Sequence, residues 1–296
     1  MTSIIAKLHT KGLIKPPPFV VGGSQYEVLM GSSAYGVSGD HSDSDVYAFC
    51  IPRKDLVFPH LAGEIAGFGT QHQRFGQFQQ HHVDSDGTQY DLVSFNIIKY
   101  FQLCLDNNPN MIDSLFVPQR CIVFTTQIGQ VVREARKKFL HRGAWHKFKG
   151  YAYSQMKKIR TDPNEKTSEK RKKSIEEFGY DVKFGYHVVR LMEEVRQVLV
   201  EGDLDLERNS EQLKSIRRGE WSLQQLQDWF ATQESSLEAV YNGSKLPWGP
   251  QDGVEDAVKT VLLQCLEAHY GSLAGAVETL GVAEEKLARI RRIVEE

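Results

Sequence analysis

The residues best suited to chemistry lie between positions 31 and 45. The stretch Gly31-Ser32-Ser33-Ala34-Tyr35-Gly36 precedes Asp43-Ser44-Asp45, and the apolar run 45–52 follows directly. A Gly-Ser turn exposes backbone N–H groups and a hydroxyl, and these donors suit phosphate oxygens. Asp- and Ser-rich turns also form through Asx hydrogen bonds alone, so an isolated D-x-D would be a weak signal. The longer pattern, in which a Gly-Ser turn, a spacer and D-x-D lead into an apolar strand, is more specific.

Asp43 and Asp45 are predicted to present two carboxylates side by side. Residues i and i+2 of a strand point to the same face, so both carboxylates face the turn that precedes them. Without a cation, one of the two would have to stay protonated. Mg²⁺ resolves this conflict, because it takes hard oxygen ligands and completes its shell with substrate phosphates. The sequence therefore predicts a site for a nucleoside triphosphate and its metal. The nucleotide-binding residues predicted in the turn are Gly31, Ser32, Ser33 and Tyr35.

The stretch GSSAYGVSGDHSDSDV resembles the motif of the DNA polymerase β-like nucleotidyltransferase superfamily. It is most similar to the RNA repair pathway polymerase β-like nucleotidyltransferases of bacteria and phages, whose motif reads G-S-x-A-Y-G followed by D-S-D-x-D or a near variant. Two more stretches agree: DLVSFNIIKYFQLCLDNNPNMIDSLFVP, and FGYDVKFGYHVVRLM with EGDLDL and IRRGEWS. The resemblance covers most of residues 25–225, whereas the tail after 245 is unmatched.

The resemblance implies a third carboxylate on a later strand, and Asp91 in QYDLVSF stands where the family places it. Asp84 and Asp86 are alternative candidates in a turn-like stretch. In the two-metal scheme, three carboxylates hold two Mg²⁺ ions, for which Mn²⁺ can substitute. Asp43, Asp45 and Asp91 are therefore the predicted catalytic and metal-binding residues.

Lys183, His187 and Arg190 are spaced i, i+4 and i+7, so they share one helix face. These potential donors could clamp the phosphates of a triphosphate or a nucleic acid, and the family's helical half carries a similar series. The alternative is a solvated basic edge, or a helix that forms salt bridges with the acidic C-terminal third. Arg53 and Lys54, just past the D-x-D strand, are weaker phosphate candidates.

The net charge of -2 conceals a basic middle section. Residues 133–173 carry 15 Lys or Arg against 4 acids, a net of +11, whereas residues 201–296 carry 18 acids against 10 bases. Such an asymmetry is typical of a polyanion partner, although a solvated helix face with a mobile loop would also produce it. The predicted RNA-binding residues are Lys147, Lys149, Lys157, Lys158, Arg160, Lys170, Arg171, Lys172 and Lys173.

Aromatic and histidine residues near these charges leave two interpretations open. Several aromatics interleave with the lysines and could either stack on a single-stranded end or face the core. They are Trp145, Phe148, Tyr151 and Tyr153. Three clustered histidines match no zinc spacing, and we interpret them as surface residues. They are His72, His81 and His82.

The pattern of apolar residues predicts an α+β fold. A small mixed sheet with flanking helices should form a catalytic domain over residues 1–125, and an all-helical domain should follow over 126–296. Strands are predicted at 26–31, 45–52 and 88–95, and a helix is predicted at 96–106. The stretch 1–20 reads as an extended arm, 60–90 as a loop or irregular hairpin, and 161–174 as a mobile segment. Helices are predicted at 127–141, 144–160, 176–201, 223–241, 252–270 and 283–294.

Composition limits the class of protein. With 41% hydrophobic and 25% charged residues, the chain has the proportions of an ordinary globular protein. No window approaches the roughly 18 consecutive apolar residues of a membrane span, and no signal peptide is recognisable. Four scattered cysteines indicate reduced thiols, so we expect a cytoplasmic protein.

These features predict Mg²⁺-dependent transfer of a nucleoside monophosphate from an NTP to an acceptor hydroxyl, with release of pyrophosphate. We expect the acceptor to be RNA, as a tRNA or an RNA 3′ end. The alternatives are nucleotidylation of a protein or small molecule, and an inactive regulator that binds nucleotide or RNA. Base preference, the number of nucleotides added and the oligomeric state do not follow from the sequence.

Overall fold

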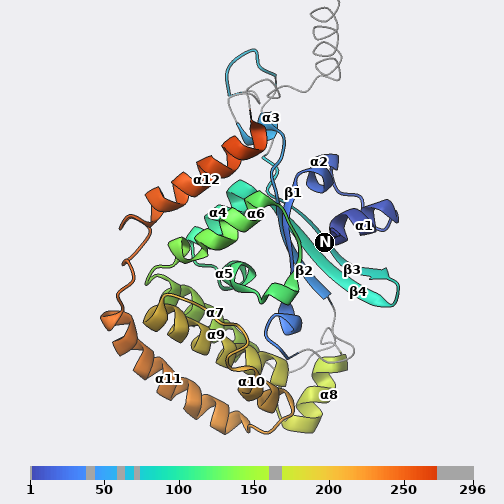
Figure 1. Cartoon of the computed structure of the whole chain (residues 1–296). Coiled ribbons are helices and arrows are strands. Elements are labelled where there is room, and N and C mark those ends of the chain that lie inside the picture. The colour runs from blue at the N-terminus through green and yellow to red at the C-terminus, as the bar shows by residue number, and fades with distance from the viewer. Residues whose placement is uncertain (1, 38–43, 59–63, 70–73, 160–168, 272–296) are drawn as a thin grey trace, which may run out of the picture.

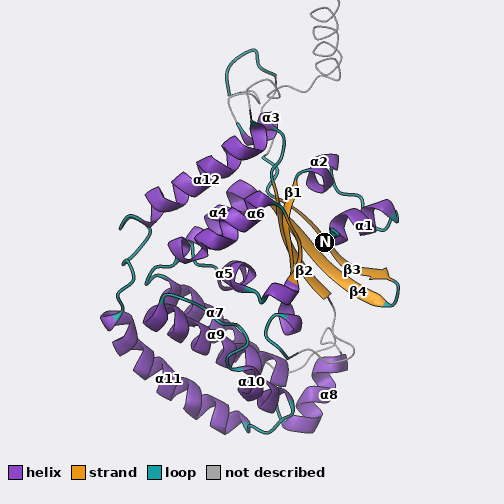
Figure 2. Ribbon diagram, viewed as in Figure 1, coloured by secondary structure: helices purple, strands orange, loops and turns teal. Residues whose placement is uncertain are grey.

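A five-stranded mixed sheet supports one half of the molecule (Figure 2). The computed structural model describes residues 2–37, 44–58, 64–69, 74–159 and 169–271. Asp43, His72, Arg160 and the predicted helix 283–294 lie outside the described residues. The strand order is β3-β4-β2-β1-β5, in which only β2 and β4 run parallel. The strands are β1 (Ser24–Leu29), β2 (Ser44–Cys50), β3 (Gln77–Ser85), β4 (Thr88–Asn96) and β5 (Ile122–Thr125). The predicted α+β class is confirmed.

Alternating side chains of β2 divide the core into two layers. Val46 and Ala48 pack with Ile5 and Leu8 on one face of the sheet, whereas Phe49 belongs to the larger cluster on the other face. Because alternate residues of a strand share a face, Asp45 points to the same side as Phe49. The helices α4 (Ile97–Leu105) and α5 (Pro109–Phe116) contribute to this second cluster.

The N-terminal 20 residues are not an extended arm, and that prediction is wrong. They form α1 (Ile4–Thr10) and α2 (Pro18–Gly22) against the first face of the sheet (Figure 1). The backbone N–H groups of Ile4 and Ile5 donate to Oε2 of the buried Glu27, at 2.8 and 3.3 Å. A carboxylate at a helix N-terminus satisfies donors that have no intrahelical partner. The partner lies more than twenty residues away, so local sequence patterns do not reveal it.

The helical half differs from the predicted elements at four places. The predicted helix 127–141 ends at Glu134, and a 3₁₀ helix, η4 (Ala135–Phe139), follows it. Residues 169–174 belong to α8 (Glu169–Phe178), although a mobile segment was predicted there. Gly179, at φ +78°, separates α8 from α9 (Val182–Glu201) and so divides the predicted helix 176–201. The helix α10 (Ser210–Arg217) was not predicted. The short helix α3 (Lys54–Val57) follows β2, and the other helices are α6 (Gln127–Glu134), α7 (Ala144–Ile159), α11 (Leu223–Gly243) and α12 (Val254–Tyr270).

Helices after residue 125 do not all lie apart from the sheet. The helices α7, α10 and α11 pack on α9, whereas α12 returns to pack on α4 and α6 (Figure 1). The Tyr270 hydroxyl donates to the carbonyl of Pro52 at 2.7 Å, which ties the end of α12 to the segment after β2. The last strand ends at Thr125, but a division into two folding domains at this point stays a prediction.

No helix in the described part of the chain is long and apolar enough to cross a membrane. The four cysteines are buried and unpaired.

Candidate active site

The Gly-Ser turn lies against Asp45, near the start of β2. Gly31–Ser33 forms a 3₁₀ turn, η1, between β1 and β2. Gly31 has a φ of +64°, and a Cβ at this position would lie 2.1 Å from Oδ2 of Asp45. Positive φ and this close approach both require glycine. The turn therefore sits directly on the Asp45 carboxylate.

Replacing Gly31 with alanine is expected to displace Asp45 and to reduce catalytic activity by about 100-fold, since misplacing a catalytic group by 1 Å can cost that much. Steady-state rates of the predicted nucleotidyl transfer, compared between the purified parent and variant proteins, measure the effect. Gly12→Ala is the matched control, because Gly12 also has a positive φ of +71° but a Cβ there meets no atom within 4 Å. Equal losses in both variants would mean that backbone strain, and not the collision with Asp45, is responsible.

Two of the three predicted carboxylates are neighbours in the sheet. Asp45 of β2 pairs with Asp91 of the parallel strand β4. Neighbouring strands lie about 4.8 Å apart, and paired residues of parallel strands share a face, so both side chains project from one side of the sheet. Adjacent carboxylate oxygens are the hard ligands that Mg²⁺ prefers, so the donor set fits this ion. Within the described ranges no three potential ligands form a metal cluster, and Asp43 lies outside them.

Arginine side chains from the segment before β5 and from α10 hold the turn in place. Arg120 donates to the carbonyl of Ser33 at 3.0 Å and forms an ion pair with Glu207. Arg217 of α10 donates to the carbonyl of Val37 at 2.5 Å. These residues were missed in the sequence, because the contacts span 87 and 180 positions and no local spacing indicates them.

Lys183 and His187 lie on α9, and His187 feels the positive charge of several nearby side chains. Burial lowers the pKa of the half-buried His187 well below its usual value, and Arg190, Lys183, Arg217 and Lys158 act in the same direction. The imidazole is therefore neutral at pH 7 and can donate or accept a hydrogen bond without adding charge. Burial also raises the pKa of the adjacent Tyr186, as does the Asp45 carboxylate. This face of α9 therefore lies within electrostatic reach of Asp45.

Arg190 and Tyr35, which were predicted to bind the nucleotide, lie in the interior of the described structure. Arg190 is 2% exposed and forms an ion pair with Asp113, and it also donates to the Tyr35 hydroxyl. The Tyr35 hydroxyl donates to Asp113 at 2.7 Å, and its ring is buried as well. Helical spacing correctly groups Arg190 with Lys183 and His187, but it does not tell which part of that stripe faces the core.

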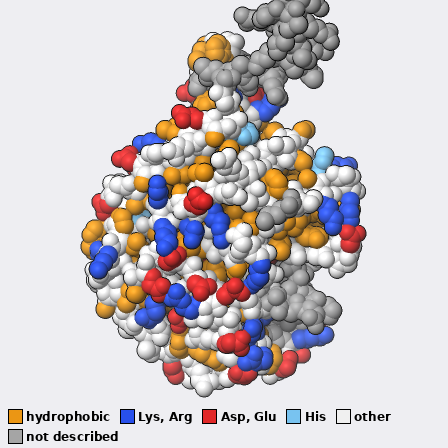
Figure 3. All heavy atoms as spheres, viewed as in Figure 1, with side chains coloured by type: hydrophobic (Ala, Val, Ile, Leu, Met, Phe, Trp, Pro, Cys, Tyr) orange, Lys and Arg blue, Asp and Glu red, His pale blue; other side chains and the backbone are white. Residues whose placement is uncertain are grey.

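Several of the predicted RNA-binding lysines are already in ion pairs. Lys147 lies 2.7 Å from Asp106, and Lys149 lies 2.8 and 3.0 Å from Glu234 and Glu238. Figure 3 shows basic and acidic side chains interspersed over the visible face. The ammonium groups of these two lysines therefore already have carboxylate partners on neighbouring helices or turns.

The remaining basic residues differ in their surroundings. Arg171 lies 3.5 Å from Asp181, and Lys172 lies 2.8 Å from Glu169. Lys157, Lys158 and Lys173 have exposed side chains, and the Lys158 ammonium lies 5.5 Å from the ring centroid of Phe184. The side chain of Lys170 lies outside the described residues, as does Arg160.

The interleaved aromatics mostly face the core. Trp145 and Phe148 are fully buried, and Tyr151 is half-buried. Tyr153 is exposed, and its hydroxyl donates to Glu234 at 2.7 Å. Trp145 and Phe148 therefore cannot stack on a nucleic acid.

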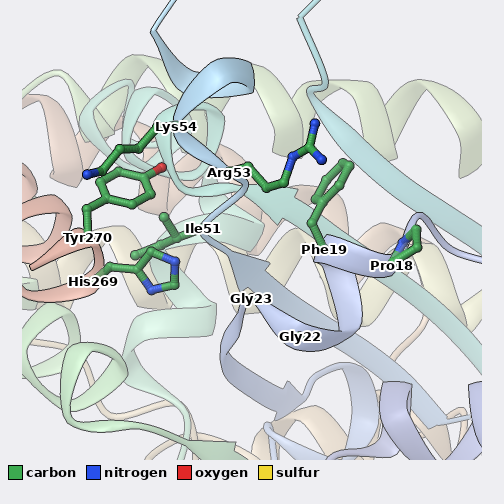
Figure 4. Close-up of a pocket in the computed structure, with 9 residues that line it drawn as sticks. All are labelled: Pro18, Phe19, Gly22, Gly23, Ile51, Arg53, Lys54, His269 and Tyr270. Atoms are coloured by element: carbon green, nitrogen blue, oxygen red, sulfur yellow. The ribbon is translucent and has the colours of Figure 1, made fainter. Parts of the chain in front are cut away.

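One cavity of the structure lies elsewhere, and its lining contains no acidic residue (Figure 4). It has a volume of about 590 Å³ and is formed by α2, the segment after β2 and the end of α12. Arg53 and Lys54 line it, although Arg53 forms an ion pair with Asp55 at 2.6 Å. At about 3.3 Å per residue, the six residues from Asp45 to Ile51 place this cavity about 20 Å along β2 from the carboxylates. Arg53 and Lys54 therefore lie toward the opposite end of β2 from the carboxylates.

His81 and His82 are exposed, as predicted for surface residues, but they adjoin Asp91. The His82 backbone N–H donates to Oδ1 of Asp91 at 2.7 Å, and Nδ1 of His81 lies 3.4 Å from Oδ2. The spacing of the histidines does not reveal this contact with Asp91, since the backbone of His82, and not a side chain, makes the closest contact.

Comparison with known proteins identifies the family. A family model described as the RNA repair pathway DNA polymerase beta family matches residues 24–236. The chain belongs to this family. The family match includes the Gly-Ser turn, both described carboxylates, α9 and α10, but it does not reach α12. The resemblance inferred from the motif is thus confirmed.

A nucleotidyltransferase-like protein from Exiguobacterium sibiricum 255-15 is similar in structure, with 8% sequence identity and a TM-score of 0.29. The similarity covers 88% of this chain and 73% of that one. Among curated proteins no match is found.

Proposed function

We propose that the protein transfers a nucleoside monophosphate from an NTP to a hydroxyl of RNA and releases pyrophosphate. The observation that carries this proposal is the in-register pairing of Asp45 with Asp91 beside the Gly31 turn. The family match supports nucleotidyltransferase chemistry, and the family's description supports a role in RNA repair.

The chemistry assigns a separate task to each part of the site. Asp45 and Asp91, together with Asp43, would hold two Mg²⁺ ions, which lower the pKa of the attacking hydroxyl and stabilise the charge on the triphosphate. The backbone N–H groups and the Ser32 hydroxyl of the turn would bind phosphate oxygens. Asp91 would accept the proton of the acceptor hydroxyl as its oxygen attacks. The acceptor oxygen then bonds to the α-phosphorus, the bond from that phosphorus to the bridging oxygen of the β-phosphate breaks, and pyrophosphate leaves.

Basic residues of the helical half are the proposed contacts for the triphosphate. The positive charges of Lys158, Lys183 and Arg217 all lower the pKa of His187, and its neutral imidazole adds no further positive charge. Arg217 also binds the carbonyl of Val37 at the end of the turn, so it connects this cluster to the carboxylate site. Multiple cations near one triphosphate would offset its negative charge and fix its orientation.

The acceptor is tested by incubating the protein with each α-labelled NTP, Mg²⁺ and bulk RNA. Separating RNA, protein and small molecules then shows which of them carries the label. Label in RNA is the expected result. Label in protein or in a small molecule would replace the proposed acceptor, and no transfer with either Mg²⁺ or Mn²⁺ would favour an inactive regulator.

RNA affinity is expected to depend on the exposed lysines of α7 and α8. Changing Lys157 and Lys173 to Glu should weaken RNA binding and leave NTP binding unchanged. For single-stranded RNA, removing one lysine–phosphate interaction should reduce the slope of log affinity against log salt by about 0.7. Fluorescence anisotropy over a salt series measures both the affinity and its slope.

The matched control changes Lys245 and Lys259 to Glu, since both are exposed and lie outside the basic section. Equal RNA binding by the parent and the Lys157/Lys173 variant, or affinity that is independent of salt, would contradict an RNA contact on α7 and α8.

A further inference from the structure

The edge strand β3 contains a bulge at the position of the third carboxylate. Gln80 pairs with Leu92 and Val83 pairs with Tyr90, so His81 and His82 together stand opposite Asp91 alone. Two residues against one define a β-bulge, and bulges next to active sites re-aim backbone and side chains. The bulge therefore lies opposite Asp91, which the proposed function uses as a metal ligand.

The extra residue adopts a conformation that has a cost. His82 has a φ of +54°, a left-handed value that is uncommon for any residue except glycine. In this conformation its N–H donates to the Asp91 carboxylate. A strained residue that persists beside a functional group calls for a functional explanation.

The contacts act on both oxygens of the carboxylate. The His82 N–H holds Oδ1 at 2.7 Å, a short distance that is typical of hydrogen bonds to an ionised acceptor. The His81 ring borders Oδ2 at 3.4 Å, and the other ring nitrogen of His81 forms a hydrogen bond with the Gln79 side-chain amide. Asp91 is 28% exposed, so without these neighbours its carboxylate could rotate.

We propose that the β3 bulge is a positioning element for Asp91, in which the His82 backbone N–H fixes the carboxylate in the orientation that binds metal. His82 is thus a positioning residue that acts through its backbone. This inference rests on the proposed function, because it assumes that Asp91 is a metal ligand. Hydrogen bonds to ligating carboxylates typically affect metal affinity or activity by about 10–100-fold.

Three variants separate the backbone from the side chain. Deleting His82 removes the bulge and restores a regular pairing with His81 opposite Asp91. His82→Gly removes the imidazole but keeps the N–H, and glycine adopts the positive φ readily. Replacing the His82 amide with an ester removes the N–H alone, and this variant decides the question if the deletion does not fold.

Metal binding is measured directly by calorimetric titration of Mn²⁺ into the whole protein, without substrate. The deletion and the ester are expected to weaken Mn²⁺ binding by about 10–100-fold. His82→Gly should remain within about twofold of the parent, because the N–H is retained. Thermal unfolding of each variant shows whether the fold is intact.

The outcomes distinguish this inference from the proposed function. A folded deletion or ester variant that binds Mn²⁺ as tightly as the parent would overturn the inference. A loss of affinity in His82→Gly equal to that of the ester would also overturn it, since the imidazole would then be responsible. Asp91→Asn is the separate arm: unchanged Mn²⁺ affinity and transfer rate in that variant would refute Asp91 as a ligand and so contradict the proposed function itself.

Discussion

Asp45→Asn is expected to reduce the rate of nucleotidyl transfer by about 10²–10⁴-fold while the fold stays intact. A metal ion contributes several kcal/mol of charge stabilisation in the transition state, and each 1.36 kcal/mol corresponds to about tenfold in rate. The Asn side chain keeps the shape of Asp45 against Gly31 but lacks the charge. Single-turnover rates with a labelled NTP measure the loss, and circular dichroism checks the fold.

Asp84→Asn and Asp86→Asn are the matched controls for Asp45→Asn. Asp84 is exposed on β3, and Asp86 forms ion pairs with Lys7 and Lys11 on the surface. Both were alternatives to Asp91 as the third carboxylate. Their variants should retain nearly the full rate, and a loss comparable to that of Asp45→Asn would mean that the site has been placed on the wrong residues.

Arg190→Leu is expected to lower the free energy of unfolding by about 3–5 kcal/mol, because breaking a buried ion pair leaves an uncompensated charge in the interior. Arg190 is 2% exposed, and its partners Asp113 and Glu194 are buried as well. Because Asp113 lies on α5, between β4 and β5, and Arg190 lies on α9, the pair joins the two halves of the molecule. Urea unfolding of the parent and the variant measures the change.

Arg208→Leu is the control for this change, since the ion pair of Arg208 with Glu201 is exposed. Exposed pairs contribute about 0–1 kcal/mol, so this variant should unfold nearly like the parent. Equal stability losses in both variants would contradict a special role for the buried pair.

Glu194→Gln should be tolerated far better than Arg190→Leu. Burial raises the pKa of Glu194 well above its usual value of 4.5, and Asp113 adds to this effect. The carboxyl is therefore favoured in its protonated form, and its contribution to stability is complete below pH 4.5 and is lost as the pH rises through the raised pKa. An amide cannot titrate, so the variant should lack this pH dependence.

The candidate carboxylate site could be inferred from the sequence because its signal is local. The Gly-Ser turn, the D-x-D spacing and the apolar strand lie within about twenty residues, and strand alternation indicates which side chains share a face. Asp91 followed from the family resemblance and a strand-like alternation. The in-register pairing of Asp45 with Asp91 confirms that the two strands are neighbours.

Features that depend on distant partners could not be predicted. The i, i+4, i+7 spacing grouped Lys183, His187 and Arg190, but only the contact with Asp113 shows that Arg190 faces inward. Likewise, the positive charge of Lys149 predicts contact with a polyanionic partner, but in the structure Lys149 forms an ion pair with Glu234. The bulge at His82 is visible only when the register of β3 against β4 is known.

The destinations of the α- and γ-phosphates of the NTP test the central claim most directly. The protein, Mg²⁺ and bulk RNA are incubated with an NTP that is labelled at the α-phosphate, and in parallel with one that is labelled at the γ-phosphate. We predict that the α-label enters RNA, that the γ-label leaves in pyrophosphate, and that Asp45→Asn reduces both rates equally. Transfer of the γ-label to an acceptor, or α-label transfer that persists at the parent rate in Asp45→Asn, would contradict nucleotidyl transfer at this site.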